Sequence, residues 1–445
     1  MLGWEKMKNR LAYDLATLAL QLEPEVTAHR ALIKQCLIDA AAAALAGYDS
    51  SAAGIASRFA VRALGAGNVT PWFSDIANVT AMGAAFVNSS AMSSLDIDDG
   101  NRAARGHLGA AVVPAASVFG SLSGVSSDTF AHAILAGCEI GGRLGAAEQP
   151  PFFASGRWAG VGAAIATGIC LGFDQEMLAN AISLSVHAAP LVAAAGVRTQ
   201  MTGHIKEGVP FGLLSGVTSA LLAQLGYQGD PDAVESVGIF DVSRIAAQLP
   251  DPFAFQRTYF KRYTCCRLAH APIDAAVAIA ARERLVVEDI DRITVRTFRT
   301  AIELPNETRP SSFESAQFSL PFAMAVALVK GTDALLPLSI QTLESSDVAA
   351  LAERVVLEHN PGFDAFYPST TPTVVQIGTR SGKRYEEQRD TADGDPGRPF
   401  TDEQLLRKLE TLGRDKVSEE RIATIVAAVR DGIPSARHFE AALRK

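Results

Sequence analysis

Apolar and small residues recur at helical spacing through the first half of this chain. Residues 32–47 are a clear case, because their apolar positions follow a helical period and Gly47 suits the end of a helix. The same pattern continues through residues 79–88, 110–120, 129–145, 160–172 and 175–189. Alternating strand patterns are almost absent there, and abundant glycine and alanine let helices pack closely. The sequence therefore predicts a large all-α domain over residues 1–264.

The pattern changes near residue 265. Period-two alternation, which is typical of strands, occurs in residues 292–298, 353–358 and 372–378. Helical spacing occurs between these runs and returns after residue 400. We therefore expect a smaller α+β domain over residues 265–395, inserted into the helical domain. The C-terminal helices, residues 396–445, are expected to return to the helical domain.

Composition argues against several classes of function. The chain has 445 residues, and its 48 acidic and 40 basic side chains give a net charge of -8. It therefore has no basic field that would attract nucleic acid or an anionic membrane. No apolar run approaches a membrane span, the N-terminus lacks the order of a signal peptide, and the five scattered cysteines lack metal-ligand spacing. We expect a cytoplasmic protein with reduced thiols and no nucleic-acid or membrane partner.

The densest group of charged side chains lies in residues 94–110, between two apolar helical stretches. It contains Asp96, Asp98, Asp99, Arg102, Arg105 and His107. A carboxylate beside an imidazole forms a base with an orienting partner, and the arginines suit an anionic substrate. The alternative is that Asp96 or Asp98 caps the following helix and the other charges are solvated.

A second group lies at the predicted domain boundary, where small-molecule sites are favoured. It contains Lys261, Arg262, Tyr263, Arg267 and His270. These residues suit carboxylate binding together with acid or base chemistry. The alternative is that Lys261 and Arg262 are solvated and that His270 only begins a helix.

A third candidate is Lys206, which lies just before an apolar helix that covers residues 211–225. Burial there would let it act as a base or bind an anion, although a lone lysine is more often a surface residue. The sequence has no dinucleotide-binding glycine motif, no Walker loop, no HExxH and no cysteine-rich pattern. We therefore expect an enzyme without a cofactor or metal.

Together the three groups resemble the MmgE/PrpD family, whose activities include 2-methylcitrate dehydration, cis-aconitate decarboxylation and iminodisuccinate epimerisation. The resemblance covers nearly the whole chain. It is carried by Leu95-Asp-Ile-Asp-Asp99 with His107, by the Lys206 segment, and by Tyr263-Thr-Cys-Cys-Arg267 with His270. The resemblance implies a helical domain with a smaller α+β lid domain, and usually a homodimer.

The resemblance also implies a cleft between the two domains. Four residues match motif positions of the family and are expected to converge there on a small di- or tricarboxylate: Asp96, His107, Lys206 and His270. Other residues of the boundary group, Lys261, Arg262, Tyr263 and Arg267, then become candidate substrate-binding residues.

Three positions depart from the family pattern. One is Leu108, which follows His107 where the family usually has proline. The other two bear on the mechanism. Trp158 lies where relatives often have a histidine nearby, and Phe322 lies where they often have a tyrosine. Both are expected to border the substrate. Their loss of polar groups disfavours dehydration, which needs an acid to help water leave.

Epimerisation needs fewer groups, namely a base on each face of the substrate and cations that stabilise an enediolate-like intermediate. His107 with Asp96 would serve one face, and Lys206 or His270 the other. The sharpest prediction is therefore epimerisation of iminodisuccinate or a similar amino-dicarboxylate. The alternatives are a lyase of the same family, either a 2-methylcitrate dehydratase or a cis-aconitate decarboxylase, and a non-catalytic carboxylate-binding protein.

Overall fold

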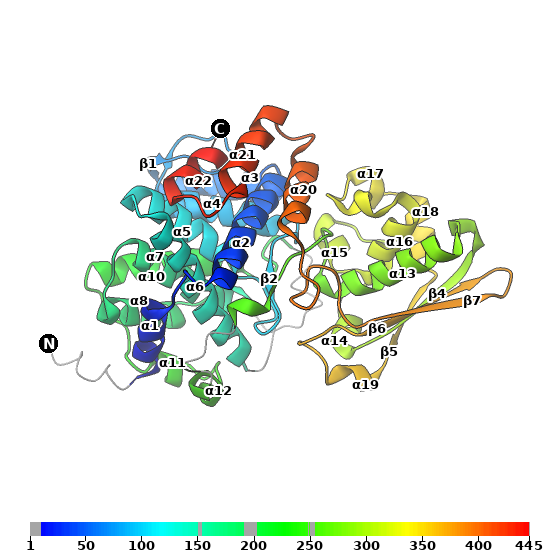
Figure 1. Cartoon of the computed structure of the whole chain (residues 1–445), viewed down its shortest axis with the longest axis horizontal. Helices are drawn as coiled ribbons and strands as arrows, with labels where there is room; N and C mark the ends of the chain where they lie inside the picture. Colours follow the sequence, from blue (N-terminus) through cyan, green and yellow to red (C-terminus); the bar gives the residue numbers. More distant parts are fainter. Residues whose placement is uncertain (1–9, 150–153, 191–202, 248, 250–253, 445) are drawn as a thin grey trace.

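Buried apolar side chains form two separate cores in a computed structural model of the chain, which describes residues 10–149, 154–190, 203–247, 249 and 254–444. The first core runs from Leu11 to Phe260 and resumes from Phe400 to Leu443. The second runs from Tyr263 to Ile377. We call the corresponding parts the helical region and the sheet region, and they lie side by side in Figure 1. The predicted boundaries at residues 264 and 395 stay predictions.

The helical region is built from long helices that follow the predicted small-residue pattern. Their bounds are α1 Leu11–Gln21, α2 Thr27–Gly47, α3 Ser51–Phe59, α4 Ala81–Ser94, α5 Gly109–Ser123, α6 Ser127–Ala147, α7 Gly156–Cys170, α8 Gln175–His187, α10 Val209–Gln224, α11 Ala233–Ser236 and α12 Val242–Ala247. Side-chain caps define several of their starts. Thr80 Oγ1, for example, accepts a hydrogen bond from Gly83 N at the start of α4.

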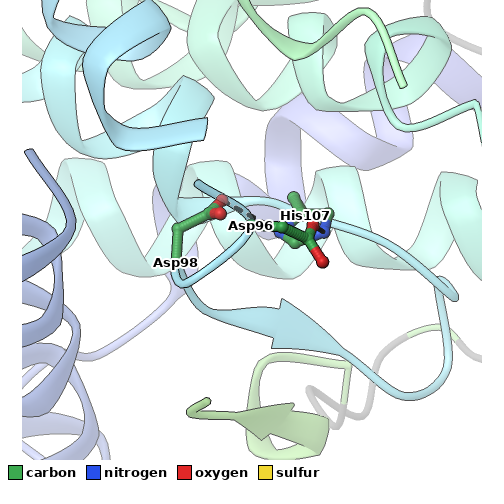
Figure 2. Close-up of side chains that lie close together, drawn as sticks. All are labelled: Asp96, Asp98 and His107. Atoms are coloured by element: carbon green, nitrogen blue, oxygen red, sulfur yellow. Dashed lines mark ion pairs between the residues drawn. The ribbon is translucent and has the colours of Figure 1, made fainter. Parts of the chain in front are cut away.

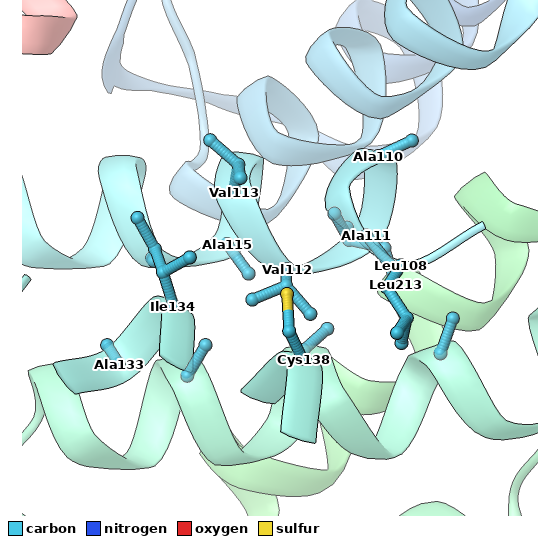
Figure 3. Close-up of a cluster of buried hydrophobic side chains, with 14 of the residues drawn as sticks. Leu108, Ala110, Ala111, Val112, Val113, Ala115, Ala133, Ile134, Cys138 and Leu213 are labelled. Atoms are coloured by element: carbon cyan, nitrogen blue, oxygen red, sulfur yellow. The ribbon is translucent and has the colours of Figure 1, made fainter. Parts of the chain in front are cut away.

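Small side chains allow these helices to approach closely. Helix α7 packs between α6 and α10, and a Cβ atom at Gly160 or Gly216 would overlap the backbone of the facing helix. Helix α5 lies against α4, α6 and α7 in the middle of this region. Figure 3 shows this layer, in which Val112 of α5 and Cys138 of α6 are buried together. The start of α5 is therefore held in a tightly packed setting.

The helical region also contains short strands, so the prediction of an all-α domain is wrong in this detail. β1 covers Ala66–Val69, and β2 (Gly100–Asn101) pairs antiparallel with β3 (Thr258–Tyr259). Two-residue strands are too short to give a period-two pattern, which explains why the sequence did not predict them. The β2–β3 pair joins the charged loop after α4 to the segment that enters the sheet region.

The sheet region contains a mixed four-stranded sheet in the order β5-β4-β6-β7. Its strands are β4 Ile290–Thr297, β5 Val355–His359, β6 Thr373–Thr379 and β7 Arg384–Arg389. β4 pairs parallel with β5 and antiparallel with β6, and β6 pairs antiparallel with β7. The accompanying helices are α13 His270–Glu283, α14 Arg299–Ile302, α15 Phe313–Gln317, α16 Leu320–Lys330, α17 Ile340–Leu343, α18 Ser346–Ala352 and α19 Pro361–Asp364. α13 packs against β6 and β7, so the sheet buries its apolar face against this helix.

The chain then returns to the helical region through α20 (Asp402–Gly413), α21 (Glu419–Arg430) and α22 (Ala436–Leu443). α20 packs on α2, and α22 packs on α5. In Figure 1, α20 lies on the side of the helical region that faces the sheet region. The two segments that connect the regions pass the loop before α5, where β3 pairs with β2 and Asp395 pairs with Arg102.

Among the described residues, no single helix is long and apolar enough to cross a bilayer. Helix α2 and residues 51–64 would be long and apolar enough if taken as one span, but the chain bends by 91° between them. The apolar side chains of α2 are buried in the helical core.

Candidate active site

The loop between α4 and α5 holds the first group of charged residues in a buried, strained turn. α4 ends at Ser94, and Asp96 then adopts a left-handed backbone conformation with φ of 55°. Such a conformation is unfavourable for residues other than glycine and persists where the surroundings enforce it. At the other end of the loop, Asp99 Oδ2 accepts a hydrogen bond from Gly109 N at 3.3 Å. The turn therefore directs Asp96, Asp98 and His107 toward one another (Figure 2).

Both ring nitrogens of His107 face acidic groups. Nδ1 lies 2.9 Å from Asp98 Oδ2 and 2.9 Å from the Asp99 backbone oxygen, while Nε2 lies 3.4 Å from Asp96 Oδ1. Burial would lower the pKa of His107, but the carboxylates of Asp98 and Asp96 raise it well above its usual value. His107 is therefore held as an imidazolium, which can donate a proton but cannot accept one.

Two lysines neutralise Asp96. Lys261 Nζ lies 2.9 Å from Asp96 Oδ2, and Lys206 Nζ lies 3.8 Å from Asp96 Oδ1. Burial would raise the pKa of Asp96, but Lys261 and Lys206 outweigh that effect and hold it well below its usual range. Asp96 is therefore a permanent carboxylate that anchors two ammonium groups.

Lys206 is itself in a strained turn, with φ of 43°, immediately before α10. Its Nζ donates hydrogen bonds to the backbone oxygens of Ser93 at 2.7 Å and Ser94 at 3.4 Å. Burial lowers the pKa of Lys206, although Asp96 and Asp98 partly restore it. The side chain of Lys206 thus binds the end of α4 and lies beside Asp96.

A narrow cleft that opens to solvent lies between the helical and sheet regions. The helical region and the segment that leaves it contribute Asp96, Asn101, Arg102, Arg105, Gly106, His107, Glu207, Tyr259 and Lys261. The sheet region contributes Cys266, Arg267, Leu268, Phe318, Tyr367 and Pro368. Of the four residues predicted to converge, Asp96 and His107 line this cleft. Lys206 borders it through Asp96 and through the ring of Phe318, whose centre lies 6.0 Å from Lys206 Nζ.

Two buried arginines of the cleft share one carboxylate. Arg102 donates to Asp395 through Nε at 2.8 Å and Nη2 at 2.7 Å, and Arg267 Nη2 lies 3.1 Å from Asp395 Oδ1. The guanidinium carbons of Arg102 and Arg267 lie 5.0 and 4.9 Å from the centre of the Tyr259 ring. Asp395 thereby holds two cations at fixed positions beside one aromatic ring.

His270 departs from its expected position, because it lies behind Arg267 and does not line the cleft. Its Nδ1 lies 3.2 Å from Arg267 Nη1, and its Nε2 lies 3.3 Å from the Cys265 backbone oxygen. Burial and the adjacent Arg267 hold the pKa of His270 well below its usual value. A neutral ring that accepts from Arg267 and donates to Cys265 satisfies both contacts, so this geometry orients Arg267.

Four other predicted substrate-binding residues lie outside the cleft lining. Arg262 is half exposed and lies 3.8 Å from Asp393. The Tyr263 hydroxyl donates to Asp274 at 2.8 Å, and Phe322 is buried in the second core. These side chains face the sheet region or solvent and do not line the cleft.

Trp158 is the fourth of these residues, and it is fully buried on α7 beneath the loop. A Cβ atom at Gly106 would lie 3.0 Å from Cζ2 of its ring, so the indole supports the loop just before His107. Trp158 is therefore a packing residue in this structure.

Several residues of the cleft were not among the predicted site residues. They are Asn101, Arg102, Arg105, Glu207, Tyr259, Phe318 and Tyr367. Arg102 and Arg105 belong to the recognised charged loop, and Glu207 follows Lys206 directly, so proximity in sequence could have indicated them. Tyr259 lies two residues before Lys261 and has the same signal. Tyr367 has none, because only the folded chain brings it to the loop.

Asp96, Asp98 and His107 also form a group whose possible ligand atoms lie within 4.8 Å of one another. Carboxylate and imidazole groups are common ligands of divalent metals. However, Lys261 and Lys206 already neutralise Asp96, and His107 is protonated. This charge pattern fits an ion-pair cluster better than a metal site, and the prediction of a metal-free protein stays a prediction.

Two family models match the chain. The MmgE/PrpD N-terminal domain matches residues 10–245, and the MmgE/PrpD C-terminal domain matches residues 263–431. The chain belongs to the MmgE/PrpD family. The predicted resemblance is thereby confirmed, and the matches divide the MmgE/PrpD protein into a mostly helical N-terminal part and a C-terminal part with a mixed sheet.

Curated relatives of this MmgE/PrpD protein include cis-aconitate decarboxylases. The mouse (Mus musculus) enzyme is 27% identical over 385 residues, which cover 78% of this chain and 75% of that protein. The human (Homo sapiens) enzyme is 24% identical over 427 residues, covering 89% and 86% of the two chains. The Aspergillus terreus enzyme is 24% identical over 380 residues, covering 77% and 76%.

Proposed function

We propose that this protein is a lyase that decarboxylates a small tricarboxylate of the cis-aconitate type. The observation that carries the proposal is the position of His107, held between Asp98 and Asp96 at the edge of a cationic cleft. The relatives named above support the lyase over the epimerase that the sequence alone favoured. The three negative charges of such a substrate are also opposite in sign to the net charge of the side chains around the cleft.

Positive groups outnumber negative groups around the cleft. The cations are Arg102, Arg105, His107, Lys206, Lys261 and Arg267. The acids are Asp96, Asp98, Glu207 and Asp395. Burial raises the pKa of Glu207, which weakens its negative charge further. A polyanion entering this cleft would meet excess positive charge, which favours binding of several carboxylates at once.

The same arrangement suits decarboxylation beside a carbon–carbon double bond. The bond from carbon to the leaving carboxylate breaks, carbon dioxide departs, and the electron pair spreads over the double bond onto a conjugated carboxylate. Lys261 and the arginines would stabilise that charge. His107 Nε2 would then donate its proton to carbon, so that hydrogen replaces the lost carboxylate.

Epimerisation is disfavoured by the position of the second base. The two groups predicted for that role, Lys206 and His270, do not line the cleft. His107 is an acid in this environment, so it would have to lose its proton before it could abstract one from the substrate. Decarboxylation requires the addition of only one proton to carbon.

The remaining expectations are kept as proposals. The sheet region would act as a lid over the cleft, the protein would form a homodimer, and it would work in the cytoplasm without a cofactor.

Proton NMR of the purified protein with cis-aconitate in deuterated water tests the proposed function. We expect loss of cis-aconitate and a decarboxylated alkene that carries one deuterium at the protonated carbon. Parallel samples contain 2-methylcitrate and the stereoisomers of iminodisuccinate. Alkene formation from 2-methylcitrate alone would indicate a dehydratase, and interconversion of iminodisuccinate isomers alone would indicate an epimerase; either result would overturn decarboxylation.

A further inference from the structure

Glu207 is a buried acid beside the proton donor of the site. Its side chain is 8% exposed, and Oε1 lies 4.0 Å from His107 Nε2, the ring nitrogen that faces the cleft. Its other oxygen, Oε2, accepts a hydrogen bond from the Ser155 hydroxyl. Ser155 Oγ in turn accepts a hydrogen bond from the His107 backbone N at 2.9 Å. Ser155 thus fixes the distance between the carboxyl group of Glu207 and the ring of His107.

Glu207 also lines the cleft, so its carboxyl group has a path to solvent. The opposite nitrogen of His107, Nδ1, has no such path, because it is engaged by Asp98 and by the Asp99 backbone oxygen. Asp96, the other carboxylate near Nε2, is paired with two lysines and cannot carry a proton. Among the described acids near Nε2, Glu207 alone combines proximity to the ring with the ability to hold a proton.

We propose that Glu207 is a proton relay that recharges His107 from solvent after each turnover. This role rests on the proposed function for its place in a catalytic cycle. It gives Glu207 no direct contact with substrate, since the residue acts through His107.

The relay moves one proton to His107 in each turnover. After His107 Nε2 gives its proton to the substrate carbon, the imidazole is neutral. The carboxyl group of Glu207 passes its proton to Nε2 and becomes a carboxylate, which then takes a proton from water. The transfer from Glu207 to His107 is favourable, because His107 is the stronger base of the two in this environment. A gap of 4.0 Å closes to hydrogen-bond distance with a small side-chain movement or through one water molecule.

The groups facing Glu207 come from several elements. Burial raises its pKa, His107 and Ser155 lower it, Asp96 raises it, and Lys261 lowers it. Burial and Asp96 outweigh the cations and Ser155, so Glu207 keeps its proton to a higher pH than an exposed acid does.

Exchange of the His107 Nε2 proton with water tests the relay without any substrate. NMR of protein labelled with ¹⁵N-histidine measures the exchange rate, and the His107→Gln variant identifies the signal. We expect Glu207→Gln, which keeps the shape of the side chain, to slow exchange on the order of 10²-fold. Glu207→Asp keeps a shortened acid and should give an intermediate rate. An unchanged rate in both variants would overturn the relay.

Glu314→Gln is the matched control, because Glu314 is also paired with a histidine, at 3.5 Å from His204 Nε2, but does not line the cleft. In Glu314→Gln, the exchange rate of the His107 Nε2 proton should equal that of the wild type. Equal slowing in Glu314→Gln and Glu207→Gln would point to general loosening and would also overturn the relay. Thermal unfolding of each variant identifies any loss of fold.

Turnover provides the second readout. With cis-aconitate, Glu207→Gln should complete a first turnover at nearly the wild-type rate, because His107 begins protonated, and should then slow in the steady state. An equal fall in rate in the first turnover and in the steady state would contradict a relay. If the wild type does not convert cis-aconitate, the proposed function fails, while the exchange rates still decide the role of Glu207.

Discussion

Lys261 contacts both the side chain and the backbone oxygen of Asp96. Its Nζ lies 2.9 Å from Asp96 Oδ2 and donates a hydrogen bond to the Asp96 backbone oxygen, also at 2.9 Å. Both side chains are almost fully buried, and Asp96 has an unfavourable left-handed backbone. The pair therefore fixes a strained turn of the helical region to the segment that enters the sheet region.

Replacement of Lys261 should leave a buried carboxylate without its nearest partner. We expect Lys261→Met to lower the free energy of unfolding by about 3–5 kcal/mol, the usual cost of breaking a buried ion pair from one side. Lys206 remains 3.8 Å away, so the lower end of this range is expected. Urea unfolding measures the change, and adding Asp96→Asn should recover part of it. A double variant that is less stable than Lys261→Met would contradict this interpretation.

The charge of His107 predicts a specific pH dependence of stability. Its folded pKa is raised well above 6.5, so its interactions add stability that is fully present below pH 6.5 and is lost as the pH rises through the folded pKa. We expect the stability difference between wild type and His107→Gln to be constant below pH 6.5 and to shrink at alkaline pH. Denaturant titrations between pH 5.5 and 9 measure it. A difference that grows with pH would show that His107 is neutral.

The sequence predicted the helices better than the contacts between distant segments. Helical spacing over residues 110–120 corresponds to α5, and the alternating run over residues 292–298 overlaps β4, because these patterns depend on local burial. The β2–β3 pair was missed, because it has only two residues in each strand. Its pairing depends on the tertiary fold.

The same limit applies to the candidate site. Asp96 and His107 belong to one loop, so their proximity follows from local sequence, and both line the cleft. Asp395 pairs with Arg102 across 293 residues of sequence, and no local pattern marks that contact. Trp158 was expected to border the substrate, but it is fully buried on α7 and does not line the cleft, and no local sequence pattern distinguishes these two positions. The catalytic roles themselves stay predictions.

Asp395 should control substrate affinity through its two arginines. Arg267 and Arg102 hold the pKa of Asp395 below its usual value although burial opposes this, so the carboxylate is charged. Asp395→Asn would leave the arginines to repel each other and to separate. Charge-assisted hydrogen bonds contribute about 1.5–3 kcal/mol, so we expect KM for the tricarboxylate to rise roughly 10- to 100-fold.

Steady-state kinetics measure this effect, and Asp393→Asn is the control. Asp393 lies two residues away but forms partly exposed ion pairs with Arg262 and Arg398. Such exposed ion pairs contribute little free energy, so the KM of Asp393→Asn should stay near the wild-type value. A larger rise in KM for Asp393→Asn than for Asp395→Asn would refute the assignment.

The contact between α7 and α10 gives a test of how packing supports the site, because α10 begins just after Lys206 and Glu207. A Cβ atom at Gly216 of α10 would overlap the Gly160 backbone oxygen of α7. Alanine normally stabilises a helix by about 1 kcal/mol relative to glycine, whereas forcing extra volume into a packed interior costs about 1–3 kcal/mol. Because the obstacle is backbone, we expect the packing cost to win, and Gly216→Ala to be destabilised and less active.

Gly54→Ala on α3 is the matched control, since its Cβ atom would meet only Arg58 Nη1, at 3.8 Å. Here the gain in helix propensity is unopposed, so thermal unfolding should show this variant to be more stable than the wild type by up to about 1 kcal/mol. The two substitutions are chemically identical and should change the melting temperature in opposite directions. If both variants are stabilised, the two helices can separate without cost, and close packing between α7 and α10 does not hold Lys206 and Glu207 in place.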